Sequence, residues 1–213
     1  FGARIDADAP FKQGVDSVAP TDIEYARELG YRIKHLGIAR REGDALQLRV
    51  HPTLIPESKA IAQVDGVLNA VMISASGVGE LLLVGPGAGS RPTASAVMAD
   101  VVSIARSVVV NEQPDVRSMG VRVDALSQPA IVPISEVSSG WYLRLDAEDK
   151  PGVMAALTHC LSQHAIGIES LIQKQESTEL AKVPIIFLTD EAPTRAIELA
   201  IADIEALPSV GGP

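Results

Sequence analysis

Three glycines at alternate positions form the spacing in this chain that points most directly to chemistry. Gly85, Gly87 and Gly89 follow an apolar run in the stretch GELLLVGPGAGS and precede a long amphipathic segment. Glycine lets a backbone approach a ligand closely, and the N-terminus of a following helix favours anions. The stretch therefore indicates either a loop that faces a nucleotide or a structural turn between a strand and a helix.

The spacing of these glycines limits the kind of nucleotide site. The dinucleotide fingerprint is G-x-G-x-x-G, whereas the sixth position here is Ser90. A complete dinucleotide fold also needs a repeated strand–helix unit and an acidic residue about 20 positions farther on, and neither is in evidence. A Walker-type loop is excluded because no Gly-Lys-Ser or Gly-Lys-Thr follows. From the pattern alone, both readings of the turn stay open.

A second turn, in the stretch AEDKPGVMAAL, has the features of a carboxylate site. Asp149, Pro151, Gly152 and Val153 stand where a strand-like run leads into a helix. The first amides of a helix lack partners within it and carry partial positive charge. We expect them to hold an α-carboxylate, with Asp149 facing an ammonium group and Val153 facing a side chain. The alternative is a tight turn without a ligand.

The other reactive side chains favour structural roles. Asp22 and Glu24 could form an acid–base pair, but acids are favourable in a first helical turn without any catalysis. Lys34 lies in a strand-like run and is interpreted as a strand residue rather than a catalytic base. The four histidines lack an H-x-x-x-H spacing, so no metal site is predicted. Cys160 falls on an apolar helix face and is expected in the core.

The first group of predicted elements must position the glycine turn. Thr21 and Glu24 have the capping-box spacing for a helix that ends at Gly30. The stretch HPTLIP is too rich in proline for a central strand. The segment after the glycines is the clearest amphipathic helix in the chain. Strand-like runs occupy residues 31–39, 45–51, 67–73 and 80–84.

The second group of elements starts at Trp141 and has the order β-α-β-β-α. Its first helix is expected to open at Pro151. A ferredoxin-like β-α-β-β-α-β unit needs one more strand, so the unit is expected to lack its last strand. Prolines and polar residues over 111–140 predict a linker. The fold class is therefore α+β: an antiparallel-rich sheet with helices, followed by a ferredoxin-like unit, truncated at both ends.

Bulk composition excludes several classes of protein. The chain has 213 residues and a net charge of −9, which argues against a nucleic-acid surface. A single cysteine excludes an internal disulfide and fits a reducing, cytoplasmic compartment. No run of 18 or more apolar residues and no signal peptide is visible, so no membrane partner is expected. Phe1 is not a natural initiator, which indicates residues missing from the front.

Several long motifs together resemble homoserine dehydrogenase, in the order and spacing of that family. They are DIEYARELGYRIKHLGIA, LRVHPTLIP, VDGVLNAVMI and GPGAGSRPTASAVMADVVSIAR, and they span about residues 1–110. The stretch YLRLDAEDKPGVMAALTHCLSQHAIGIESLIQK resembles an ACT regulatory domain. The resemblance implies a substrate and dimerisation domain over 1–110 whose helix returns to a nucleotide domain, a linker over 111–140, and an ACT domain over 141–213.

The same resemblance implies a function. The family interconverts L-aspartate 4-semialdehyde and L-homoserine by hydride transfer with NAD or NADP, in threonine, methionine and isoleucine biosynthesis. It implies that Gly89, with Gly87 beside it, closes over the cofactor, and that the catalytic residues lie upstream of Phe1, so the fragment alone is expected to be inactive. Threonine is the implied effector, and a dimer or tetramer the implied assembly. The rival interpretation is a non-catalytic ACT module that senses an amino acid.

Overall fold

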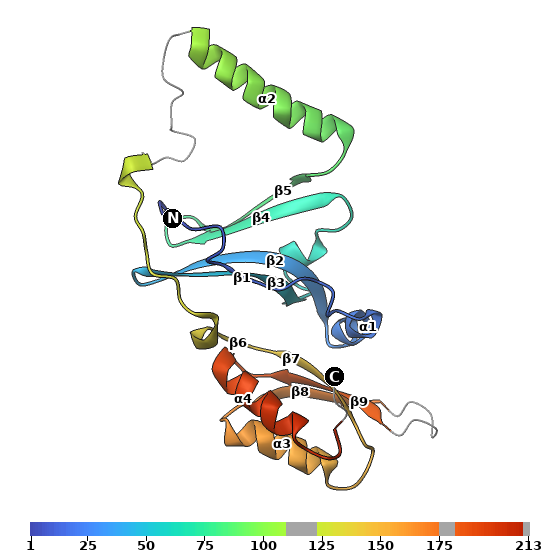
Figure 1. The fold of residues 1–213 in the computed structure, drawn as a ribbon. Coiled ribbons are helices and arrows are strands. Elements are labelled where there is room, and N and C mark those ends of the chain that lie inside the picture. Colours follow the sequence, from blue (N-terminus) through green and yellow to red (C-terminus); the bar gives the residue numbers. More distant parts are fainter. Residues whose placement is uncertain (110–122, 175–181, 211–213) are drawn as a thin grey trace. The chain divides into compact units, whose positions relative to one another are not determined.

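A computed structural model describes residues 1–109, 123–174 and 182–210 (Figure 1). It has the predicted α+β class, with four α-helices among the described residues and sheets that are antiparallel except where β1 pairs with β3. The chain divides into two compact units, each taken by itself below. The first unit comprises residues 1–7, 26–34 and 53–129, and the second comprises 8–25, 35–52 and 130–213.

A long hairpin is the first sheet of the fold. Strands β2 (Tyr31–Glu42) and β3 (Ala45–Pro56) join β1 (Phe11–Lys12) in the order β1-β3-β2. The stretch HPTLIP, which was predicted not to form a central strand, is the end of β3, which continues to Pro56. Strand β1 pairs with β3 only at Arg49 and Val50, so the prolines lie beyond that pairing, where β3 needs no amide donors toward β1.

The first unit contains a second hairpin and the longest helix. Strands β4 (Leu68–Ala75) and β5 (Gly79–Pro86) are antiparallel, and α2 (Ser90–Val109) follows. The stretch ESKAIAQV, whose sequence pattern indicates a short helix, forms only a short 3-10 turn over Ala60–Gln63. Helix α2 is long and apolar enough, by length and composition alone, to cross a membrane, although no apolar run of 18 residues was found. None of its residues is buried in the described part of the chain.

The second unit has the order expected of a ferredoxin-like fold. Strands β7 (Tyr142–Ala147), β9 (Val183–Thr189) and β8 (Ile168–Gln173) form an antiparallel sheet in the order β7-β9-β8. Helices α3 (Val153–Gln163) and α4 (Thr194–Glu205) lie together against one side of this sheet (Figure 1). Val210 makes an antiparallel bridge to Ala147 at the outer edge of β7, which is where a ferredoxin-like unit places its last strand.

A dense apolar core holds this sheet and its helices together. The fully buried side chains include Leu157, Phe187 and Ile197, which come from α3, β9 and α4 respectively. Aliphatic residues dominate the core, as the low aromatic content predicts. The short strands β6 (Ser138–Ser139) and β10 (Ala192–Pro193) pair beside it, and 3-10 turns occupy Val123–Ala125 and Ile134–Glu136.

Two predicted helix starts differ from the structure. Helix α1 (Pro20–Glu28) begins at Pro20, and the Asp22 carboxylate accepts the Ala19 amide at 2.8 Å, so the capping pattern lies two residues earlier than Thr21 and Glu24. Helix α3 begins at Val153 rather than Pro151, because Gly152 at φ 93° cannot belong to a helix. The predicted linker over 111–140 falls partly outside the described residues. The stretch ESTELAK, whose polar composition indicates a turn, lies almost wholly outside them.

Candidate functional site

The glycine turn joins β5 to α2 in the first unit. Strand β5 ends at Pro86 and the helix begins at Ser90. Gly89 has φ 117°, a conformation that other residues rarely adopt, and its carbonyl accepts the Thr93 amide at 3.1 Å. A Cβ at Gly89 would contact the Pro92 ring at 3.4 Å and no other described residue within 4 Å. The turn therefore needs glycine here and leaves its surroundings open.

Gly87 is explained by contacts within the chain. Its amide donates to the Val67 carbonyl at 3.3 Å, and a Cβ at this position would overlap the side-chain amide of Asn69. At Gly85, which pairs with Asn69 across the hairpin, an added Cβ would meet nothing within 4 Å. The structural reading therefore accounts for Gly87 fully. Gly89 and the first amides of α2 keep the geometry that receives an anion.

The turn before α3 carries the four predicted effector residues. Gly152 is the N-cap residue of α3, with φ 93°, and no side chain caps the helix there. A Cβ added at Gly152 would meet nothing within 4 Å. The Val153 amide already donates to the Lys150 carbonyl at 3.2 Å. Pro151 is exposed and lies before the helix. An approach to the helix N-terminus is thus open from the Gly152 side, as a carboxylate ligand would require.

Two of these side chains are already engaged. The Asp149 carboxylate accepts a hydrogen bond from the Gln173 side chain of β8 at 3.0 Å. Val153 is buried in the core beneath the helix. Gln173 therefore orients Asp149 at the turn. Val153 packs into the core and does not face the open space beside Gly152, where a ligand side chain was expected to contact it.

The Asp22 carboxylate, which the sequence analysis assigned to a first helical turn rather than to an acid–base pair, is buried and ties α1 to the sheet of the second unit. Asp22 is 5% exposed and accepts hydrogen bonds from the Tyr142 hydroxyl at 2.7 Å and the Arg144 Nε at 2.8 Å. Tyr142 and Arg144 are two residues apart on β7 and so share one face. The alternation along β7 indicates that Tyr142 and Arg144 share a face. No local pattern, however, indicates that their partner is Asp22, about 120 positions away.

Burial and the Asp22 charge set the protonation of this cluster. Burial, reinforced by the hydrogen bond to Asp22, raises the pKa of the Tyr142 hydroxyl far above its usual value of about 10. Burial works to lower the pKa of Arg144, but the charge and hydrogen bond of Asp22 outweigh it and leave the pKa raised. Both groups therefore stay protonated at neutral pH, and the cluster holds one paired charge rather than a proton donor.

The remaining candidates have structural roles in the described residues. Lys34 Nζ donates to the Val64 carbonyl and the Asp65 carboxylate, each at 2.6 Å, and the hydrogen bond from Lys34 lowers the pKa of Asp65. Cys160 is buried in the core, as predicted. The ring of His164 pairs with Asp203 at 2.7 Å. The described part of the chain holds no group of three or more His, Cys, Asp or Glu side chains able to bind a metal.

Comparison with known proteins identifies the family. A sequence profile described as homoserine dehydrogenase matches residues 1–102. The homoserine dehydrogenase of Pseudomonas aeruginosa is 44% identical over 213 residues, which is 100% of this chain and 49% of the relative. The chain belongs to the homoserine dehydrogenase family. That of Neisseria gonorrhoeae is 43% identical over the same share.

A solved structure extends this match to the fold. The crystal structure of a homoserine dehydrogenase from Thiobacillus denitrificans is 42% identical and superimposes with a TM-score of 0.86, covering 100% of this chain and 48% of that one. The chain thus spans about half the length of the homoserine dehydrogenases it matches. The recognition made from the motifs is confirmed at the level of the family.

Proposed function

We propose that the protein carrying this chain interconverts L-homoserine and L-aspartate 4-semialdehyde with NAD or NADP, and that it serves amino-acid biosynthesis in the cytoplasm. The observation that carries the proposal is the match over the whole chain to a homoserine dehydrogenase structure at 42% identity. The chain provides the substrate and dimerisation domain over 1–110, a linker over 111–140 and an ACT unit over 141–213. The catalytic residues belong to the remaining half.

The glycine turn is the part of the cofactor site that this chain supplies. A Cβ at Gly89 would contact only the Pro92 ring within 4 Å, and the backbone angle excludes most side chains; both features fit a closely approaching nicotinamide cofactor. When bound, that cofactor supplies the hydride chemistry. Gly89 and the first amides of α2 bind and orient the cofactor. Gly87 lets the turn pack closely against the Asn69 side chain.

The ACT unit senses an amino acid, and threonine is the effector we propose. The open N-terminus of α3 receives the α-carboxylate, and Asp149, oriented by Gln173, meets the ammonium group. This regulatory role adds to the dehydrogenase activity. A non-catalytic sensing module would use the same turn but would not explain the family match over residues 1–102.

Pairing through the β4–β5 hairpin makes the protein at least a dimer. Cross-strand neighbours Val71 and Leu83 are 59% and 63% exposed, and Ile73 and Leu81 beside them on the same face are also exposed. A contiguous apolar face of this kind is typical of an obligate interface.

A chimaera tests the proposed activity. This chain would replace the matching segment of the P. aeruginosa enzyme, and homoserine oxidation would be assayed with each nicotinamide cofactor. We expect turnover from the chimaera and none from the 213-residue chain alone. A correctly folded chimaera without activity would contradict the dehydrogenase proposal, and turnover by the chain alone would contradict the division of the site between the two halves.

A further inference from the structure

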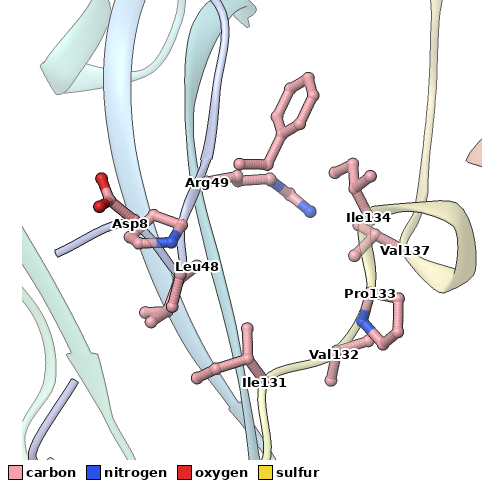
Figure 2. Close-up of a pocket in the computed structure, with 11 residues that line it drawn as sticks. Asp8, Leu48, Arg49, Ile131, Val132, Pro133, Ile134 and Val137 are labelled. Atoms are coloured by element: carbon pink, nitrogen blue, oxygen red, sulfur yellow. The ribbon is translucent and has the colours of Figure 1, made fainter. Parts of the chain in front are cut away.

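A cavity in the second unit has a mostly apolar lining with two charged residues, Arg49 and Asp8. It has a volume of about 400 Å³ and lies between β3, the segment that leads into β1, and the segment 131–137. Figure 2 shows Leu48 and Arg49 of β3 on one side, facing Ile131, Ile134 and Val137 on the other. A volume of this size suits a small organic molecule.

Arg49 is the charged group that distinguishes this cavity from an ordinary packing defect. Its Nη1 donates to the Gln47 side chain at 3.1 Å, while its Nε is buried and has no hydrogen-bond partner among the described residues. A buried polar atom without a partner is unfavourable, so this guanidinium is incompletely satisfied by the chain. It therefore has hydrogen-bonding capacity that a ligand would use if the side chain shifted slightly.

The charges around Arg49 favour an anion over a cation. Burial, together with the positive charge of Arg40, lowers the pKa of Arg49, and Glu42 opposes this effect. Glu42 already accepts a hydrogen bond from Gln47. Asp8 also lines the cavity, but in Figure 2 its carboxylate points away from the guanidinium, and it pairs with Lys12 at 3.2 Å. An added anion would relieve the repulsion between Arg40 and Arg49.

We propose that this cavity binds a small aliphatic monocarboxylate, with the carboxylate on Arg49 and the hydrocarbon part against the apolar wall. A guanidinium forms paired, charge-assisted hydrogen bonds with a carboxylate. A branched hydrocarbon part of the ligand would pack against the aliphatic side chains of Leu48, Ile131 and Val137. The site shares no residue with the turn at 149–153, and its ligand needs no ammonium group, so it is a second anion site within the same unit.

Methyl NMR of the 213-residue chain locates the ligand. The probe is 4-methylpentanoate, and 4-methylpentan-1-ol and 4-methylpentan-1-amine are the isosteres that lack the carboxylate. We expect the acid to shift the methyl signals of Leu48, Ile131, Ile134 and Val137, and the alcohol and amine to leave them in place. If the alcohol shifts them at the same concentration, the cavity is merely apolar and the proposal is overturned.

Arginine variants give an independent test. Arg49→Met, which keeps an apolar stem, should weaken binding of 4-methylpentanoate about 10- to 100-fold, the range expected for losing hydrogen bonds to a charged group. Arg49→Lys keeps the charge and should weaken it less. Arg195→Met, on the exposed side of α4, is the matched control and should change nothing. Unchanged affinity in folded Arg49→Met would overturn the proposal, and the alcohol comparison decides it if that variant does not fold.

Discussion

At the scale of single residues, Gly89 carries the argument for a shared cofactor site. Gly89→Val in the chimaera should raise the cofactor KM at least about tenfold, because a branched side chain cannot adopt φ 117° readily and fills the open approach. Gly85→Val is the matched control, since an added Cβ there meets nothing within 4 Å. Steady-state kinetics beside thermal unfolding separates the two effects. An unchanged KM with normal stability would show that Gly89 does not face the cofactor.

The Tyr142–Asp22 hydrogen bond gives a second prediction at this scale. Tyr142→Phe should lower the free energy of unfolding by about 1–3 kcal/mol at pH 7, because it removes a donor to a buried carboxylate. The folded-state pKa of Tyr142 is raised, so wild-type stability is fully present below the unfolded value of about 10 and falls as pH rises above it.

The alkaline loss of stability should therefore shrink in the variant. Urea unfolding of the chain at pH 7, 9 and 11 measures both effects, with Tyr31→Phe as the matched control. An equal alkaline loss in wild type and Tyr142→Phe would mean that Tyr142 is not the titrating group.

At the scale of elements, the sequence predicted what periodicity and turn chemistry determine. The alternation in β7 and the amphipathic stripe of α2 are local properties, and both elements are present. The partners of Asp22 and the cavity at Arg49 arise from segments far apart in the chain, which no local pattern encodes. The start of α1 was predicted two residues too late, because Thr21 and Glu24 have the same capping-box spacing as Ala19 and Asp22. Pro20 favours the earlier start, since proline is suited to the first position of a helix.

The β4–β5 hairpin leads to a prediction about assembly. Leu83→Lys in the chimaera should convert the dimer to a monomer, because it places a charge at the centre of the proposed apolar interface, opposite Val71. Glu80→Lys, near the tip of the same strand, adds the same side chain outside that face and serves as control. Light scattering at micromolar concentration measures the result. A monomeric chimaera before mutation would refute the dimer itself.

The turn before α3 leads to a prediction about regulation. Gly152→Asp in the chimaera should abolish threonine binding in calorimetry, because the side chain fills open space and sets a negative charge beside the carboxylate. Gly152→Asn tolerates the positive φ better and lacks the charge, so it should retain part of the binding. Gln163→Asp adds the same charge at the other end of α3. If the unmutated chimaera gives no binding heat and no inhibition at millimolar threonine, the turn has no regulatory role.

At the scale of the whole molecule, we attribute the exposed apolar surface of α2 to packing against the half of the longer protein that this chain does not span. The relatives are about twice as long as the chain, and α2 has apolar side chains but no buried residue in the described part. In the domain organisation that we propose, this helix returns to a nucleotide domain in the other half of the protein. The apolar composition of α2 would then reflect packing against protein rather than against lipid.

Val101→Asp on α2 distinguishes these environments. Val101 is 50% exposed in this chain, so the change should alter the stability of the chain alone by less than about 0.5 kcal/mol. In the chimaera the same side chain is expected to be buried, and the loss should exceed about 2 kcal/mol, because burial of a valine is lost and a charge enters an apolar contact. Chemical unfolding measures both proteins, and Ser103→Asp on the same helix is the control. Equal effects in the two proteins, together with flotation of the chain on lipid vesicles, would replace the packing account with a membrane one.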